Sequence, residues 1–444
     1  TTGGTSGKRI QPFSEPTGPV DLAINTYQQY QFHEKDIYNI GTVGRRWFGE
    51  RFNIESEQEF TFNFPDIVTS QPIDLKVYTA AISSSNTSME LSVNGSVIRN
   101  LTFGSSSTTI IGSESFYVGS LDVTTGDIKV KLSYNNQGNP SAQGYLDYIS
   151  IEATRLLNFD SRQFQFKSKE VINNSGIAEY TISNASRLPE VWDVTDIYNV
   201  LNIENNEGET NFSFTSNMGE ERIYVALSPS DYFQPKSDRN NTVRNQNIKG
   251  TIFNNSEGGF QDIDYLIVAP NNMLNQAERL AQINRNQYNI NVRVVGLDEI
   301  YTEFSTGNQD IAAIRNLVKY IYDNASSPDK RLKYLCLFGD GSYDYKDRIP
   351  NNTNIVPSWH SYSSLNLTNS FVSDDFYGMM DDNEGTMTNS NRLDIAVGRI
   401  LADTPQRAKV LVDKIESYYT KESLGRWRNN YVVVSDDVDK DWEG

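Results

Sequence analysis

The stretch YLCLFGDGSYDYKD, residues 334–347, decides the fold prediction, because a strand-like apolar run in it ends in an acidic turn. Residues 334–338 are apolar or aromatic throughout, which is typical of a strand buried on both faces of a parallel sheet. Asp340, Asp344 and Asp347 follow. Ligands of open α/β sheets gather beyond the carboxyl ends of the strands, so we expect this turn to lie at a functional edge.

The segments on either side of this strand alternate between strand-like and helix-like patterns. Apolar residues recur at helical spacing around 275–287 and 311–321, and Thr404 followed by Pro405 is typical of the start of another helix. This alternation predicts a mostly parallel sheet covered by helices. The further strands expected in it are YLIVAP (265–270), INVRVVGL (290–297), LDIAVGRI (393–400) and YVVVSDD (431–437).

The first half of the chain has the shorter period of β-strands. Asn94 and Gly95 lie between two alternating runs, which predicts a type I′ hairpin because both turn residues must accept a positive φ. Ile128, Val130, Leu132 and Tyr134 alternate in the same region. We therefore predict a β-sandwich here. A second β-rich unit follows, with the strand-like runs FQFKS, IAEYTIS, NFSFTS and RIYVAL between residues 159 and 227.

The bulk composition narrows the possible partners and chemistry. The formal net charge of −18 repels a phosphate backbone, so we expect no nucleic-acid partner. No apolar stretch approaches the roughly 20 residues that a membrane-spanning helix needs. Cys336 is the one cysteine of the 444 residues, so no intrachain disulfide can form.

Several aspartates stand where they could share one edge of the predicted sheet. SDDFYGMMDD (373–382) supplies four of them, and Asp436 and Asp437 follow the last predicted strand. Such an edge suits a basic side chain or calcium. The alternative is a solvated acidic loop whose aspartates make turn hydrogen bonds. No EF-hand pattern is present. The candidate calcium ligands are Asp340, Asp344, Asp375 and Asp381.

Cys336 is predicted to be structural. It lies in the middle of the apolar run, where a free cysteine behaves as a small buried hydrophobe, whereas a nucleophile belongs at a strand end. The two histidines, His33 and His360, lie in a predicted β-domain and a polar loop, and we expect each to be a surface or packing residue and not a base. The opposing hypothesis, catalysis by Cys336 and His360, requires an exposed thiol beside an imidazole.

Five segments, which follow one another in the same order as in the family, resemble the gingipain family of cysteine peptidases. Two more, RRWFGERF (45–52) and VWDVTD (191–196), are similar to parts of the β-domains in the type IX secretion sortases of that family. The resemblance thus extends over nearly the whole chain. The five segments are EFSTGNQDIAAIRNLVKYIYDN (303–324), LFGDGSYDYKD (337–347), SDDFYGMMDD (373–382), LDIAVGRI (393–400) and WRNNYVVVSDD (427–437).

The resemblance implies a caspase-like α/β peptidase domain of two subdomains with a Cys–His dyad. In the family both dyad residues follow the strand that YVVVSDD resembles, so no catalytic residue is expected in this chain, and the chain alone is expected to be inactive. The predicted fold is thus two N-terminal β-sandwich-like domains followed by a partial gingipain domain. The expected parts are a mobile arm (1–19), a jelly-roll-like sandwich (20–157), a second β-rich domain (158–258), the first gingipain-like subdomain (259–425) and the truncated start of the second (426–444).

The resemblance also implies a substrate and a location. Asp374 matches an aspartate at the base of the specificity pocket of Arg-specific gingipains, and would pair with a basic substrate side chain. Structural calcium is a family property. The type IX sortases remove C-terminal sorting domains from secreted cargo and attach the cargo to a surface glycolipid, beside an outer-membrane β-barrel partner of Bacteroidota. The alternative is a non-catalytic surface protein whose β-sandwich binds a glycan or a protein partner.

Overall fold

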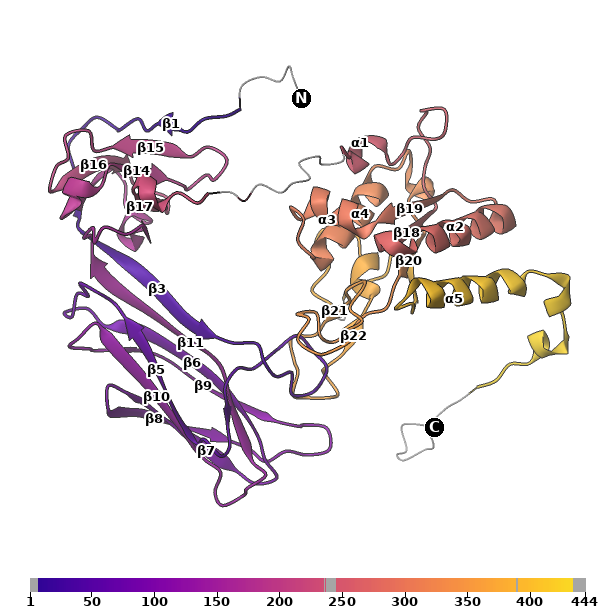
Figure 1. Ribbon diagram of the computed structural model, residues 1–444, viewed down its shortest axis with the longest axis horizontal. Coiled ribbons are helices and arrows are strands. Elements are labelled where there is room, and N and C mark those ends of the chain that lie inside the picture. Colours follow the sequence, from indigo (N-terminus) through magenta and orange to yellow (C-terminus); the bar gives the residue numbers. More distant parts are fainter. Residues whose placement is uncertain (1–6, 235, 237–244, 389, 434–444) are drawn as a thin grey trace. The chain divides into compact units, whose positions relative to one another are not determined.

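The computed structural model describes residues 7–234, 236, 245–388 and 390–433, and divides into two compact units. The first unit comprises residues 1–41, 46–241 and 365–368, and the second comprises 42–45, 242–364 and 369–444. The first is a β structure and the second contains the α/β sheet (Figure 1). Among the residues described, no helix has the length and apolar character that crossing a bilayer requires.

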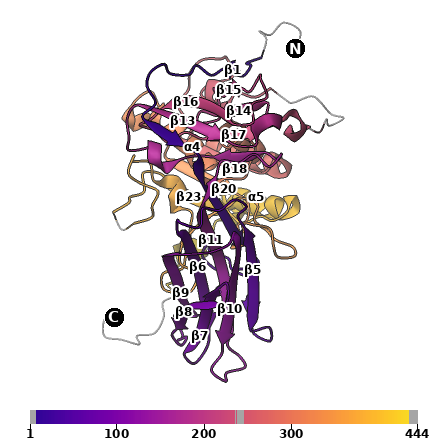
Figure 2. The same ribbon diagram turned by 90° about the vertical axis from the view of Figure 1, so that its left-hand side faces the viewer.

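The first unit contains the predicted β-sandwich, in which all strand pairs are antiparallel (Figure 2). Its core is continuous across the two sheets and includes Ile128, Val130 and Leu132, as their alternation predicted. One sheet has the order β5 (Glu57–Asn63), β10 (Asp127–Asn135), β7 (Thr87–Val93), β8 (Ser96–Phe103). The other has the order β3 (Thr26–Glu34), β11 (Gln143–Leu156), β6 (Ile73–Ile82), β9 (Ser113–Leu121), with β4 (Arg51–Phe52) also paired to β11.

The turn between β7 and β8 is the predicted hairpin. Val93 pairs with Ser96, and the two residues between them, Asn94 and Gly95, have φ angles of 49° and 83°. Both positive angles match a type I′ turn, whose twist suits the flanking strands. The sequence signal for this hairpin is therefore confirmed.

Two smaller sheets in the first unit enclose a second core that is rich in aromatic rings, including Phe166, Tyr180 and Tyr224. The four strand runs predicted here all form strands. Within the predicted N-terminal arm, residues 1–6 lie outside the described residues and Gln11–Pro12 form a strand. The sheet orders are β1 (Gln11–Pro12), β15 (Leu201–Glu204), β14 (Glu190–Asp193), β17 (Tyr224–Leu227), β12 (Phe164–Phe166), and β16 (Phe212–Asn217), β13 (Ile177–Ile182), β2 (Leu22–Ile24).

The second unit is built on a parallel sheet with helices on both faces, as predicted. The order is β19 (Val292–Gly296), β18 (Tyr265–Ala269), β20 (Tyr334–Phe338), β23 (Ala396–Ile400). The helices are α1 (Ile248–Thr251), α2 (Leu274–Tyr288), α3 (Leu297–Phe304), α4 (Ile311–Asp323) and α5 (Pro405–Tyr418), and a small sheet joins β21 (Trp359–His360) to β22 (Val372–Ser373).

Successive residues of each central strand enter different cores, which explains the continuous apolar runs. Leu266 and Leu335 pack with α3 and α4, whereas Ile267 and Cys336 pack with α2 and α5. Helices α2 and α5 lie side by side in Figure 1 and contact each other. Strands of this composition require cover on both faces, and the two pairs of helices supply it.

The ends of the helices follow from local chemistry. The Thr404 hydroxyl accepts a hydrogen bond from the backbone N–H of Arg407, which caps α5 as predicted. Asp310 caps α4 in the same way through the N–H of Ala312. The fifth predicted strand is not seen: residues 431–433 form no strand and are exposed, and residues 434–437 lie outside the described part of the chain.

Candidate functional site

A cavity of about 280 Å³ lies at the carboxyl edge of β20 and β23. This is the edge where the acidic turn was predicted to act. Four of its lining residues carry hydroxyl groups, and two, Asp374 and Arg399, are ionic. The lining residues are Gly341, Ser342, Tyr343, Ser358, Val372, Ser373, Asp374, Arg399 and Leu401.

The two ionic residues of the cavity bind each other. Arg399 Nε lies 2.7 Å from Asp374 Oδ2, and Arg399 Nη2 lies 2.7 Å from Asp374 Oδ1. The side chains are 10% and 23% exposed. This is the bidentate geometry in which guanidinium and carboxylate bind most strongly. Asp374, predicted to pair with a basic substrate side chain, is here paired with an arginine of its own chain.

The remaining donors of Arg399 bind the backbone around it. Nη1 donates to the carbonyl oxygens of Gly339, at 2.9 Å, and Val356, at 2.7 Å. Nη2 also donates to Ser358 Oγ, and that hydroxyl donates to Asp374 Oδ1, both at 2.9 Å. All five N–H groups of the guanidinium thus have acceptors. Hydrogen bonds from Arg399 therefore connect the residue that follows β20, the loop at 356–358 and Asp374.

Asp344 organises its own loop. It is fully buried, and its Oδ2 accepts hydrogen bonds from the backbone N–H groups of Arg348, at 2.5 Å, and Ile349, at 2.7 Å. Its Oδ1 accepts from the N–H of Lys346 at 3.2 Å. Oδ1 of Asp340 accepts from the N–H of Gly341 at 2.9 Å. The hydrogen bonds of Asp344 are the turn-forming kind named as the alternative to metal binding.

The other candidate calcium ligands are dispersed. Asp375 begins a short 3₁₀ helix and is exposed, as is Asp381. Within the described ranges, no three or more His, Cys, Asp or Glu side chains form a group that could hold a metal ion. Asp436 and Asp437 lie outside those ranges. Calcium stays a prediction without a ligand set.

Cys336 and His360 lie in different surroundings. Cys336 is 4% exposed in the core formed with α2 and α5. Burial raises the pKa of its thiol to about 12, although a hydrogen bond with Tyr265 lowers it in part, so the thiol is protonated at neutral pH. His360 is buried, and burial lowers the pKa of its imidazole. It lines a cavity of about 240 Å³ in which its ring lies 5.8 Å from that of Tyr345.

His33 and the segment RRWFGERF contribute to packing of the sandwich. His33 Nε2 lies 2.9 Å from Glu50 Oε1, and Lys35 Nζ lies 2.8 Å from the same oxygen. Burial raises the pKa of Glu50, but the hydrogen bonds from Lys35 and His33 outweigh it and lower the pKa. Arg46 is buried and pairs with Asp147 and Glu114.

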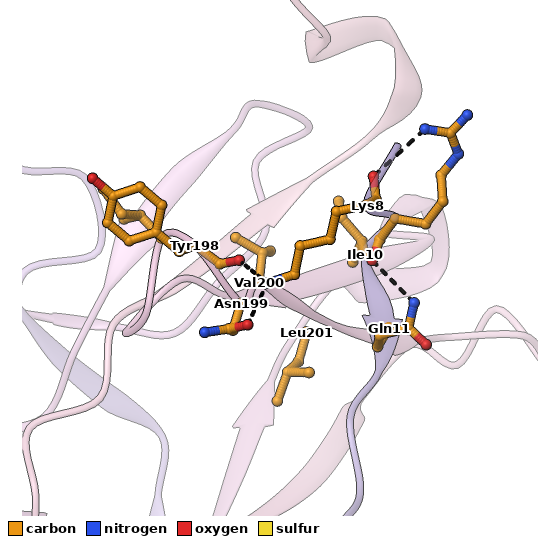
Figure 3. A pocket seen from close by; sticks show the side chains of 9 residues that line it. Lys8, Ile10, Gln11, Tyr198, Asn199, Val200 and Leu201 are labelled. Carbon is orange, nitrogen blue, oxygen red and sulfur yellow. Dashed lines mark hydrogen bonds between the residues drawn. The ribbon is translucent and has the colours of Figure 1, made fainter. Parts of the chain in front are cut away.

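A further pocket, of about 260 Å³, lies beside β1 in the first unit (Figure 3). Its walls come from residues 8–11 and 197–201. Lys8 Nζ donates to the carbonyl oxygen of Tyr198 and to Oδ1 of Asn199 (Figure 3). No carboxylate, thiol or imidazole is among the residues that line this pocket.

Comparisons with known proteins agree with this architecture. Residues 259–443 match the model of peptidase family C25. The crystal structure of dimeric latent PorU from Porphyromonas gingivalis matches with a TM-score of 0.76 and 21% identity, over 95% of this chain and 40% of that one. The chain thus spans well under half the length of PorU. No curated protein sequence matches.

Weaker structural matches include single carbohydrate-binding modules. One is the CBM36-1 domain of a xylanase from the hindgut metagenome of Trinervitermes trinervoides, at 14% identity and a TM-score of 0.19, over 28% of this chain and 96% of that one. Another is a family 35 carbohydrate-binding module from Clostridium thermocellum, at 16% identity and a TM-score of 0.19, over 28% of this chain and 95% of that one. The match to peptidase family C25 shows that residues 259–443 resemble the gingipain family of cysteine peptidases, and the chain has a PorU-like fold.

Proposed function

We propose that this chain is the N-terminal portion of a gingipain-like cysteine peptidase and sortase that processes type IX-secreted cargo. The observation that carries the proposal is the family C25 match of a region whose parallel sheet has a cavity at its carboxyl edge. Cys336 is buried and protonated, so it does not supply the nucleophile. The proposal assigns the dyad cysteine and histidine to sequence that follows Gly444.

The chemistry would be acyl transfer at the cell surface. The dyad thiolate attacks the peptide carbonyl before the C-terminal sorting domain, and the sorting domain leaves with a new amino terminus. An amine of the surface glycolipid, or water, then displaces the thiolate from the acyl-enzyme. The enzyme would act on the outer face of the outer membrane, beside a β-barrel partner. The cavity at Asp374 and Arg399 would hold a side chain of the cargo polypeptide.

Deletion of the gene in the bacterium that encodes this chain tests the proposal. Mass spectrometry of surface and medium proteins should then find cargo that retains its sorting domains and is lost from the surface. Complementation with the Cys336→Ala gene should restore processing, because Cys336 is not the nucleophile. Cargo that is still trimmed and attached after the deletion would remove the proposal.

A second candidate function is glycan binding by the sandwich. Tyr148, Tyr78 and Phe116 lie in register across β11, β6 and β9, and their rings stack at 4.8 and 5.1 Å. Tyr30 and Phe32 of β3 are 57% and 62% exposed on the same face. Exposed apolar faces of this kind mark interaction sites, and flat rings suit the apolar faces of sugars.

A glycan array distinguishes this second candidate. Wild type should bind a defined set of glycans, and the double variant Phe32→Ala, Phe116→Ala should lose them. Tyr198→Ala removes an aromatic ring that is 78% exposed elsewhere in the first unit and serves as the control. Equal binding by all three proteins, or by none, would exclude the aromatic face as a glycan site.

A further inference from the structure

The cavity at the carboxyl edge of β20 and β23 contains one negative and one positive group, and each is the partner of the other. With 23% of its side chain exposed, Asp374 borders the space that a ligand would enter. A free carboxylate in such a place binds a lysine or arginine side chain. Arg399 of the same chain already occupies that carboxylate.

Arg399 cannot be displaced easily. Besides the two bonds to Asp374, its guanidinium donates to three backbone carbonyl oxygens and to Ser358 Oγ, and its side chain is only 10% exposed. An incoming cation therefore meets a carboxylate that is satisfied on both oxygens. An incoming anion finds no free N–H on Arg399, because all five have acceptors. The ionic pair thus attracts neither charge.

The rest of the lining is uncharged. Ser342 and Ser373 supply hydroxyl groups, and Val372 and Leu401 supply apolar surface. Gly341 is closely packed, since a Cβ at this position would lie 3.1 Å from Ser358 Oγ. The volume of about 280 Å³ lies just below the range for drug-sized ligand pockets, roughly 300–1,000 Å³. It suits one side chain of a polypeptide.

We propose that Arg399 is a specificity-determining residue: by holding Asp374 it makes this cavity reject lysine and arginine and accept an uncharged side chain. The inference rests on the proposed function, in which a polypeptide substrate lies along this edge of the sheet. It predicts that the cavity becomes a site for a guanidinium ligand once Arg399 loses its charge.

Calorimetric titration with agmatine, a decarboxylated arginine, tests this on the full chain. Arg399→Met keeps an unbranched apolar stem and removes the guanidinium. It should bind agmatine about tenfold or more tightly than wild type, the change expected from charge-assisted hydrogen bonds to one carboxylate. The double variant Arg399→Met, Asp374→Asn should lose that gain. 1-Pentanol, which has a similar stem and no charge, should not distinguish wild type from Arg399→Met.

Arg399→Gln is the second variant, because its amide can still donate to the backbone carbonyl oxygens. If either variant is unstable, agmatine must raise its melting temperature with increasing concentration, as any ligand of the folded state does. Absence of both binding and a shift in melting temperature in the two variants would overturn the proposal, as would agmatine binding by wild type that is as tight as binding by Arg399→Met. The agmatine titration needs no peptidase activity. Cargo processing that is unchanged after deletion of the gene would therefore remove the proposed function, whereas the binding result would still hold.

Discussion

The guanidinium of Arg399 and the carboxylate of Asp374 form a bidentate ion pair, with two N–O distances of 2.7 Å, between residues 25 positions apart in the chain. The pair joins β23 to the segment that precedes Phe376 and Tyr377, two residues of the core beneath it. Asp374 is thereby held in one orientation at the cavity. On our proposal, this partner, and not the charge of Asp374 alone, determines what the site can bind.

The ion pair should also stabilise the second unit. Arg399→Met leaves the Asp374 carboxylate without its main partner, and we expect it to lower the unfolding free energy by about 2–3 kcal/mol. Asp374→Asn should have a smaller effect. In the double variant the two losses should not add, with a coupling of about 1–2 kcal/mol. Urea unfolding combined with hydrogen exchange of β20 and β23 measures these quantities.

Lys409→Met is the matched control for this cycle. Lys409 pairs with Asp413 on the surface of α5, where the two side chains are 61% and 40% exposed. Exposed pairs contribute little, so we expect a change below about 0.5 kcal/mol. Strictly additive losses at Arg399 and Asp374 would show that the pair has no net stabilising role.

The strands and most helices could be predicted because local periodicity decides them. Leu335 and Cys336 already indicate a strand covered on both faces, and Thr404 with Pro405 marks a helix start. Helix α3 was missed because it begins at Leu297, directly after β19 ends at Gly296, so no loop separates the strand from the helix. Strands β14 and β15 were also missed; each has four residues, of which two are polar.

The site could be predicted only in part, because its main contact is tertiary. The sequence marks Asp374 as an acid beside the sheet, but periodicity says nothing about a partner 25 positions away. The one signal was a charge inside the predicted strand LDIAVGRI, since a buried arginine needs acceptors. Likewise, the sequence shows that residue 344 is an aspartate. It does not show that backbone N–H groups of the same loop donate hydrogen bonds to its carboxylate.

Cys336 should react slowly with thiol reagents in the native protein. Its side chain is buried and its pKa is raised to about 12, so little thiolate is present at neutral pH. Iodoacetamide should label the native chain at least about a hundredfold more slowly than the chain unfolded in guanidinium, because labelling requires opening of the core. Mass spectrometry follows the reaction.

The same cysteine should be irrelevant to any peptide hydrolysis by this chain. Wild type and Cys336→Ala should both leave fluorogenic peptides intact over hours. Cys336→Ser should instead lower stability by about 1–2 kcal/mol, because it buries a hydroxyl group in an apolar core. Rapid native labelling, or turnover that Cys336→Ala abolishes, would revive the hypothesis of catalysis by Cys336 and His360.

Asp344 should stabilise its loop without calcium. Asp344→Ala leaves the N–H groups of Arg348 and Ile349 without their acceptor, and we expect a loss of about 1–3 kcal/mol. Melting temperatures of wild type and variant, each measured with calcium and with EDTA, test this. The difference between the proteins should be the same in both conditions. Asp382→Ala, at a side chain that is 93% exposed, should change stability little. A calcium-dependent gain confined to wild type would assign Asp344 to a metal site.

Glu50 should make the first unit sensitive to acid. Hydrogen bonds from Lys35 and His33 outweigh the effect of burial and lower the pKa of Glu50 below its ordinary value of 4.5. A carboxyl group whose pKa is lower in the folded state stabilises that state above its unfolded pKa, and this contribution disappears as the pH falls through the folded pKa. Glu50→Gln should therefore lower stability by about 1 kcal/mol near neutral pH. The difference in melting temperature from wild type should persist down to about pH 5 and shrink below 4.5. Glu59→Gln, in an exposed pair with Lys129, should show little difference at any pH. A wild-type advantage that stays constant into acid would mean that Glu50 acts through packing and not through its charge.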